Sequence, residues 1–202
     1  FLFIVQGEGR GHLTQALAME EMLLRNGHEV VEILVGKSNS RRLPGFFNRN
    51  VKAPVKRFIS PNFLPTAENK RASIGRSALY NAMKVPEYLR SMYYIQKRIK
   101  QSGAEVIINF YELLTGLTYA LCKPSAPYIC IGHQYLFLHK DFEFPQKSMS
   151  QLAMLRLFTR ITSIGSMKRL ALSFQDMPED EEQRITVVPP LLRKEITSVQ
   201  AD

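Results

Sequence analysis

The first 36 residues read FLFIVQGEGRGHLTQALAMEEMLLRNGHEVVEILVG. Residues 1–5 form a short apolar run, which predicts a strand buried on both faces. After a glycine loop, apolar residues recur at helical spacing over residues 12–26, and a second strand is predicted over residues 29–35, closed by Gly36. A strand, a helix and a second strand in this order form a βαβ unit, so the sequence predicts a parallel sheet.

The rest of the chain continues this alternation. A polar, basic loop is expected over residues 38–50, and a long loop over residues 60–73. Further elements are predicted as strands at residues 55–59, 106–110, 128–132, 170–174 and 185–188, and as helices at residues 74–101, 113–122 and 151–163, with Pro86 marking a break or kink. This order predicts an α/β fold with a Rossmann-like, doubly wound, mainly parallel sheet.

The composition excludes several classes of protein. The chain has 202 residues, of which 45% are hydrophobic and 22% charged, as in a globular protein rather than a disordered or collagen-like one. No stretch approaches the ~18–20 apolar residues of a membrane span, and the first apolar run is too short for a signal peptide. Cys122 and Cys130 do not make a disulfide framework, so we expect a cytoplasmic location.

Basic residues are concentrated between residues 37 and 100. This segment holds 15 Lys and Arg and two acidic residues, whereas the whole chain has a net charge of +9. Such a segment favours anionic partners, so one interpretation is a polyanion- or nucleic-acid-binding α/β module. The other interpretation is a solvated face that keeps the protein soluble. No recognised nucleic-acid-binding motif accompanies the charge.

Three loops are expected to meet at the carboxyl ends of the strands, where open α/β sheets bind their ligands. They are residues 7–12, residues 111–112 and residues 133–135. Their chemically active side chains are those of two histidines, a glutamate and a glutamine: His12, His133, Glu112 and Gln134. The sequence therefore places the candidate site at this edge of the sheet.

The glycine loop does not match the common phosphate-binding motifs. In the dinucleotide fingerprint G-x-G-x-x-G, Gly7 and Gly9 fit, but His12 stands where the third glycine belongs. No acidic residue ends the second predicted strand, and no Gly-Lys-Ser or Gly-Lys-Thr follows the loop as a P-loop requires. A dinucleotide-binding oxidoreductase domain is therefore the least favoured alternative.

His12 is expected at the start of the first helix. The positive end of the helix dipole disfavours imidazolium, so this side chain should stay neutral near pH 7. A neutral imidazole beside a glycine-walled cleft suits a general base that accepts a proton from a hydroxyl nucleophile. The alternative is a polar residue that simply caps the helix.

Three blocks carry a resemblance to a known family. GEGRGH at residues 7–12, followed by Ala16-Leu17-Ala18 and Gly27-His28-Glu29-Val30, resembles the amino-terminal signature of GT-B glycosyltransferases. AEVIINFYE and APYICIGHQY are similar to the part that walls the acceptor cleft in that family, and ITVVPPLLR to the exit into the second domain. The pattern is closest to the peptidoglycan N-acetylglucosaminyltransferase and related uncharacterised bacterial enzymes.

The resemblance implies a function and a set of site residues. It implies transfer of a sugar from a nucleotide-sugar donor, typically a UDP-sugar, to the hydroxyl of a lipid-linked or small-molecule acceptor, with inversion and without a metal or other cofactor. His12 would be the catalytic base or a positioning residue, and Glu112 with His133 and Gln134 would line the opposite wall. The substrate-binding residues implied are Gly7, Gly9, Arg10, Gly11, Glu112, His133 and Gln134.

The resemblance also implies a division into domains. Residues 1–190 would form the amino-terminal, acceptor-binding domain, and residues 191–202 the start of an interdomain linker. The carboxy-terminal domain, which holds most of the donor site in this family, would be absent from this chain. We therefore expect the chain alone to be inactive.

A basic segment with two aromatic residues is a candidate membrane contact. Phe46 and Phe47 follow a Pro-Gly turn and lie close to Arg41 and Arg42. Exposed aromatic and basic side chains together favour a peripheral anionic membrane surface. The alternative is that both phenylalanines pack onto the sheet or onto a partner domain.

Overall fold

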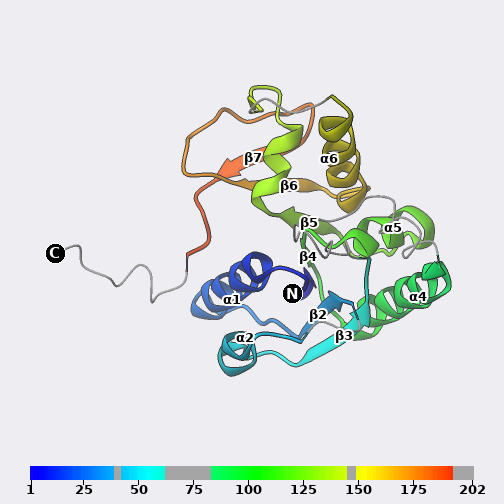
Figure 1. Cartoon of the computed structure of the whole chain (residues 1–202). Coiled ribbons are helices and arrows are strands. Elements are labelled where there is room, and N and C mark those ends of the chain that lie inside the picture. Colours follow the sequence, from blue (N-terminus) through cyan, green and yellow to red (C-terminus); the bar gives the residue numbers. More distant parts are fainter. Residues whose placement is uncertain (39–41, 62–82, 145–148, 193–202) are drawn as a thin grey trace, which may run out of the picture.

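The computed structural model describes residues 1–38, 42–61, 83–144 and 149–192. Its centre is a seven-stranded sheet with the strand order β3-β2-β1-β4-β5-β6-β7, in which every neighbouring pair is parallel (Figure 1). The strands are β1 (Leu2–Gln6), β2 (Glu32–Lys37), β3 (Val55–Ile59), β4 (Ile107–Phe110), β5 (Tyr128–Ile131), β6 (Lys168–Leu172) and β7 (Ile185–Val188). The predicted Rossmann-like α/β fold is confirmed, and the strand order reverses direction between β1 and β4.

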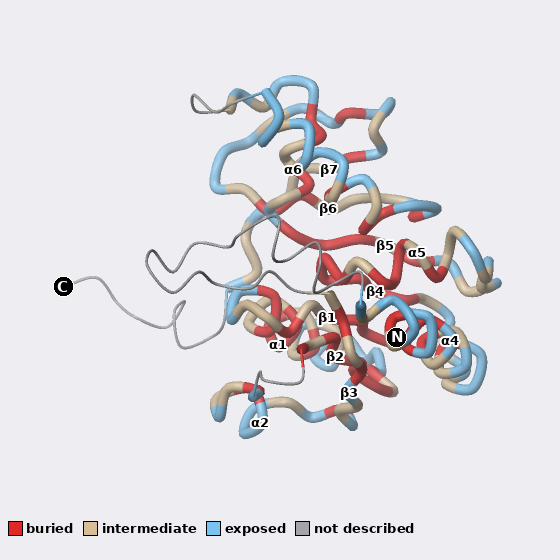
Figure 2. The backbone as a smooth tube through the Cα atoms, turned by 45° about the vertical axis from the view of Figure 1, so that its right-hand side comes forward, coloured by how far each residue is buried: buried red, intermediate tan, exposed pale blue. Residues whose placement is uncertain are grey.

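Helices cover both faces of the sheet. They are α1 (Arg10–Arg25), α2 (Gly45–Asn50), α4 (Val85–Ser102), α5 (Leu113–Cys122) and α6 (Met149–Thr162), with the 3₁₀ helix η1 (His133–Leu138) after β5. Residues on α1 and α2, such as Leu13 and Phe47, pack into one apolar cluster, here called the α1 cluster. Residues on α4 and α5, such as Ile95 and Leu114, pack into the other, the α4 cluster. Figure 2 shows the buried residues gathered along the strands and on the sheet-facing sides of the helices.

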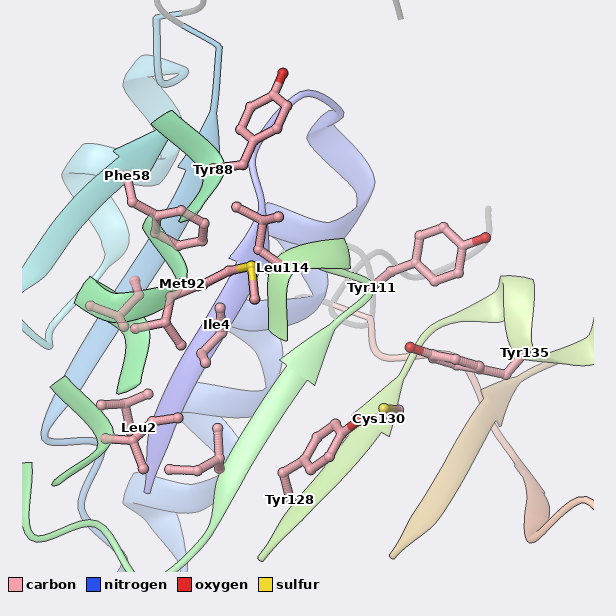
Figure 3. Close-up of a cluster of buried hydrophobic side chains, with 14 of the residues drawn as sticks. Leu2, Ile4, Phe58, Tyr88, Met92, Tyr111, Leu114, Tyr128, Cys130 and Tyr135 are labelled. Carbon is pink, nitrogen blue, oxygen red and sulfur yellow. The ribbon is translucent and has the colours of Figure 1, made fainter. Parts of the chain in front are cut away.

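The strands contribute alternate residues to the two clusters. Phe3 and Val5 of β1 face α1, whereas Leu2 and Ile4 face α4. This alternation follows from the period of two in a strand, and burial on both faces explains why β1 is uniformly apolar. Figure 3 shows the α4 cluster, with Tyr111 at its edge near the carboxyl end of β4.

The second strand begins later than the sequence predicts. β2 starts at Glu32 rather than at residue 29, because β1 pairs with β2 in a register that places Leu2 opposite Glu32. The carbonyl of Glu29 instead accepts a hydrogen bond from the terminal amino group of Phe1 at 2.7 Å. Strand pairing, which depends on the whole sheet, therefore decides where this element begins.

Residues 45–50 form the helix α2 instead of the expected loop. Pro44 precedes the helix, and Phe47 is completely buried in the α1 cluster. Because Phe47 is part of the core, the predicted membrane contact is wrong for this residue. Phe46 is half-buried against the same cluster, Arg42 is exposed, and Arg41 lies outside the described residues.

The predicted helix over residues 74–101 is described only from residue 83 onward. α4 begins at Val85, and Pro86 lies in its first turn, where a missing N–H leaves no hydrogen bond unmade. Pro86 therefore starts this helix rather than kinking it. Most of the loop expected at residues 60–73, like the segment 193–202, lies outside the described residues. None of the described helices is both long and apolar enough to cross a membrane.

Candidate functional site

Three aromatic rings meet at the carboxyl ends of β1, β4 and β5. His12 lies in the first turn of α1, Tyr111 directly after β4, and His133 at the start of η1. The imidazole of His12 is nearly parallel to the ring of Tyr111, at 19° with ring centres 5.6 Å apart, and to that of His133, at 5° and 6.3 Å. The predicted convergence of these loops at one edge of the sheet is confirmed.

Two glutamine side chains bind the two ring nitrogens of His12. Oε1 of Gln15 lies 3.2 Å from Nδ1, and Nε2 of Gln134 lies 3.1 Å from Nε2. An amide oxygen accepts and an amide nitrogen donates, so Nδ1 carries the proton and Nε2 presents its lone pair. Sequence analysis identified Gln134 but missed Gln15, although its position three residues after His12 on a helix places both on one face.

His12 is neutral in this environment. Its side chain is 7% exposed, and burial is the main cause that lowers the pKa of His12 from 6.5 to about 4. The hydrogen bond to Gln15 raises the pKa and the neighbouring His133 lowers it, both less than burial does. Burial also lowers the pKa of His133. The prediction of a neutral imidazole is confirmed, but the chief cause is burial rather than the helix dipole.

Tyr111 has an unusual backbone conformation. Its φ of +59° lies in the left-handed region, which bulky residues rarely adopt. Its side chain is 8% exposed, and burial raises the pKa of its hydroxyl. The sequence places Tyr111 at the carboxyl end of a strand but contains no signal for this backbone conformation, so sequence analysis did not include it among the site residues.

Glu112 is buried and does not line an open wall. It is the N-cap of α5 and fully buried, with Oε1 accepting hydrogen bonds from Ser60 Oγ at 2.5 Å and from the Leu114 amide at 3.2 Å. Oε2 has no hydrogen-bond partner among the described residues. Burial raises the pKa of Glu112 from 4.5 to about 7. Neither carboxylate oxygen reaches the surface in this structure, and the expected contact of Glu112 with substrate stays a prediction.

The three glycines of the loop differ in their surroundings. Gly7 is buried, its amide donates to the Gly36 carbonyl at 2.7 Å, and an added Cβ would lie 2.6 Å from Val35 Cγ1. Gly7 is therefore required for packing and has no free amide to offer a ligand. By contrast, a Cβ at Gly11 would meet nothing within 4 Å, and one at Gly9 would meet only Oε1 of Gln6, at 3.9 Å.

A cavity of about 490 Å³ lies beside these residues. It joins the amino-terminal turn of α1 to the segments that follow β5, β6 and β7. Its lining comprises Arg10, Gly11, Thr14, Gln15, His133, Leu172, Phe174, Pro190, Leu191 and Leu192. One side thus presents a guanidinium and an imidazole, and the other side is apolar. His12 is not among the lining residues, but Gln15 and His133, which both contact its imidazole, are.

The described residues contain no group of three or more His, Cys, Asp or Glu side chains that could hold a metal ion. The expected absence of a metal or other cofactor remains a prediction. The site offers the neutral imidazole of His12, whose Nε2 accepts a hydrogen bond from Gln134, near a cavity lined by the cationic side chain of Arg10. A neutral imidazole suits the removal of a proton from a hydroxyl, and a guanidinium suits the binding of an anionic group.

The family model of glycosyl transferase family 1 matches residues 1–202, the whole chain. No curated protein matches the chain in sequence. The match confirms the resemblance on which the expected site residues rest, and it favours neither the nucleic-acid-binding module nor the oxidoreductase domain.

Solved structures of UDP-glycosyltransferases share the fold. UGT2 of Phytolacca americana, complexed with UDP-2fluoro-glucose and pterostilbene, matches 96% of this chain and 55% of its own at 14% identity and a TM-score of 0.57. UGT89C1 of Arabidopsis thaliana, complexed with UDP-L-rhamnose, matches 98% of this chain and 50% of its own at 15% identity and a TM-score of 0.54. The complex of the same enzyme with quercetin matches 95% of this chain and 50% of its own at 16% identity and a TM-score of 0.53. The chain therefore spans about half the length of these structures.

Proposed function

Because the chain belongs to glycosyl transferase family 1, we propose that it is the acceptor-side half of an enzyme that transfers a sugar from a UDP-sugar to an acceptor hydroxyl. The similar solved structures contain UDP-sugars and are about twice as long as this chain, which supports a second domain that supplies most of the donor site. The observation that carries the proposal is the buried, neutral His12 beside a cavity at the carboxyl ends of the strands.

In the proposed reaction the acceptor oxygen attacks the anomeric carbon of the donor sugar. The new bond joins the acceptor oxygen to that carbon, the bond to the diphosphate breaks, and the diphosphate leaves with its electron pair. Nε2 of His12 takes the proton of the hydroxyl. A single displacement of this kind inverts the configuration at the anomeric carbon.

The hydrogen bonding around His12 sets a condition for this step. Nε2 already accepts a hydrogen bond from Gln134 at 3.1 Å, so the acceptor hydroxyl must replace the Gln134 amide before its proton can move. A catalytic hydrogen bond often forms only when substrate is bound, so the arrangement without substrate is compatible with this role. Gln15, on Nδ1, keeps the ring in the tautomer whose unprotonated nitrogen is Nε2, the form that can act as base once Gln134 is displaced.

The donor would also change the proton affinity of His12. Burial holds the imidazole neutral in the absence of negative charge nearby. A diphosphate close to the ring would favour the imidazolium form, because opposite charges attract strongly in a poorly hydrated site. His12 would therefore become a stronger base once the donor is bound.

The cavity supports an acceptor with an apolar portion and an anionic or polar group. Leu172, Phe174 and Leu191 offer apolar contacts, and Arg10 offers a cation. Quercetin and pterostilbene, found in the complexes of the similar structures, have large apolar parts bearing hydroxyl groups. We propose a lipid-linked or small-molecule acceptor of this kind, with the enzyme acting in the cytoplasm.

The test is transfer by the full-length protein that carries this chain, measured with a panel of UDP-sugars and hydroxylated acceptors. We expect His12→Ala to lower kcat by about 10²–10⁴ while the fold is retained, as for loss of a general base. His28→Ala is the matched control, since His28 is exposed beyond the end of α1. Unchanged kcat in His12→Ala would exclude the base role, and no transfer from any UDP-sugar would count against the activity itself.

A further inference from the structure

We propose that Tyr111 is a positioning residue for His12, whose ring covers the imidazole and excludes water from it. The inference rests on the proposed function of His12 but concerns a residue to which that function assigns no role. Tyr111 and His12 come from different loops, after β4 and β1, and their rings lie nearly parallel with centres 5.6 Å apart.

The backbone at Tyr111 is strained in a way that a purely structural tyrosine does not need. A bulky non-glycine residue in the left-handed region is strained and persists only where the surroundings hold it. At φ +59°, the chain turns from β4 into the N-cap of α5 and brings the Tyr111 ring against His12. A smaller residue such as glycine or asparagine would make the same turn with less strain.

The side-chain amide of Asn109 stabilises this turn through both its oxygen and its nitrogen. Its Oδ1 accepts a hydrogen bond from the Glu112 amide at 3.0 Å, and its Nδ2 donates to the Glu112 carbonyl at 3.2 Å and to the Thr162 carbonyl at 2.8 Å. The two residues between Asn109 and Glu112 are thereby clamped. Asn109 is fully buried, so these bonds do not compete with water.

Contacts of the side chain also fix the Tyr111 ring in place. Its hydroxyl donates to Thr159 Oγ1 of α6 at 2.8 Å, because that oxygen uses its own proton for the Leu155 carbonyl. The ring also packs against Tyr135 and Phe158, with centres 5.6 and 5.7 Å away. Figure 3 shows Tyr111 and Tyr135 side by side beyond the end of β4. Rotation of the ring away from His12 would break all of these contacts.

The neighbours of His12 leave Tyr111 as a main barrier to water. Among the described residues, the titratable groups in ring contact with the imidazole are Tyr111 and His133, and His133 is itself exposed. The two glutamines contact the ring through its nitrogens, whose hydrogen bonds form along the ring edge, and neither amide makes the ring-stacking contact that Tyr111 makes. Removing the Tyr111 ring should therefore admit water to His12 and ease its protonation.

The test follows the protonation of His12 by NMR in the 202-residue chain with labelled histidine, using His12→Gln to assign the signal. Tyr111→Gly and Tyr111→Asn remove the ring, and both residues suit the positive φ. We expect the midpoint of His12 titration to rise by at least one pH unit in both variants, a tenfold gain in proton affinity. Tyr111→Phe keeps the ring and should leave the midpoint within a few tenths of the unmodified chain.

The matched control is Tyr119→Gly, a half-buried tyrosine on α5 whose ring packs against Tyr128 rather than His12. It should lower thermal stability without moving the His12 titration. An unchanged midpoint in folded Tyr111→Gly and Tyr111→Asn would overturn the proposal, as would failure of both to fold, which would make Tyr111 a core residue only. The titration is independent of sugar transfer, so failure of the proposed function would show in the kinetic assay instead.

Discussion

Nε2 of Gln134 lies 3.1 Å from Nε2 of His12 and occupies the lone pair that a general base would use. The two residues are 122 positions apart in the chain and meet because α1 follows β1 and η1 follows β5 at the same edge of the sheet. The site therefore has an internal donor where the acceptor hydroxyl is expected to bind. Substrate binding must compete with one hydrogen bond, whose net value is about 0.5–1.5 kcal/mol.

Gln15→Leu should change the tautomer of His12. Gln15 Oε1 accepts the Nδ1 proton, and loss of this acceptor removes the preference for the tautomer with Nδ1–H. We expect part of the imidazole to shift to the Nε2–H form, visible in the ¹⁵N chemical shifts of both ring nitrogens at pH 7. Gln96→Leu is the control, because Gln96 lies on α4 and its side chain donates to the Cys122 carbonyl rather than to His12. Identical ring shifts in Gln15→Leu and the unmodified chain would contradict this assignment of the proton.

Binding of UDP to the full-length protein should raise the pKa of His12. Without ligand, burial lowers this pKa to about 4, and an opposite charge within a few ångströms raises such a value by about 1–3 units. NMR titration with and without saturating UDP measures the change, with the exposed His28 as an internal reference. A His12 titration that does not respond to saturating UDP would mean that the diphosphate lies far from the imidazole.

Glu112→Gln should be more stable than the unmodified protein at high pH, by a margin that shrinks at low pH. The native carboxyl of Glu112 has a pKa raised to about 7, so between about pH 4.5 and pH 7 the unfolded state binds fewer protons than the native state. The stabilising contribution of the protonated native carboxyl is present below pH 4.5 and is lost as the pH rises through 7. Glutamine does not ionise and keeps an oxygen for Ser60 and Leu114.

The measurement for Glu112→Gln is denaturant unfolding at pH 5 and pH 8. Between these values, the free energy of unfolding of Glu112→Gln should increase relative to that of the unmodified protein by up to about 3 kcal/mol. Glu182→Gln, at an exposed turn, should show no such pH-dependent difference. A difference of the same size at both pH values would show that the carboxyl of Glu112 does not titrate in this range.

Gly36→Ala should destabilise the fold, whereas Gly11→Ala should not. A Cβ at Gly36 would lie 2.3 Å from Glu112 Oε2 and 2.8 Å from Phe58 Cζ, and overpacking of this kind costs about 1–3 kcal/mol. At Gly11, in the first turn of α1, a Cβ meets open space, and alanine favours the helix by up to about 1 kcal/mol. Thermal unfolding of both variants checks the contrast, and equal losses of stability would contradict it.

Gly11→Ala also separates packing from ligand binding. Gly11 lines the cavity beside Arg10, so an added methyl group would occupy space that the acceptor is proposed to use. We expect a higher KM for the acceptor with retained thermal stability in the full-length enzyme. An unchanged KM would mean that the acceptor does not approach this turn of α1.

Some features followed from local sequence alone. The spacing of apolar residues located α5 and β7 with the bounds that the structure has, because each pattern reflects one face of a single element. The topology rule for parallel sheets then placed His12 near His133 without any side-chain information. The start of β2 and the helix at residues 45–50 were missed, since strand register and burial of Phe47 depend on segments elsewhere in the chain.

The sequence by itself determined the βαβ order, the parallel sheet and the edge at which His12 and Gln134 meet, because apolar periodicity and glycine punctuation act over neighbouring residues. Only the tertiary structure decided that Glu112 is buried, that Tyr111 adopts a left-handed conformation and that Gln134 binds the imidazole of His12. The physical reason is that burial and hydrogen bonding at the site depend on contacts between segments far apart in the chain.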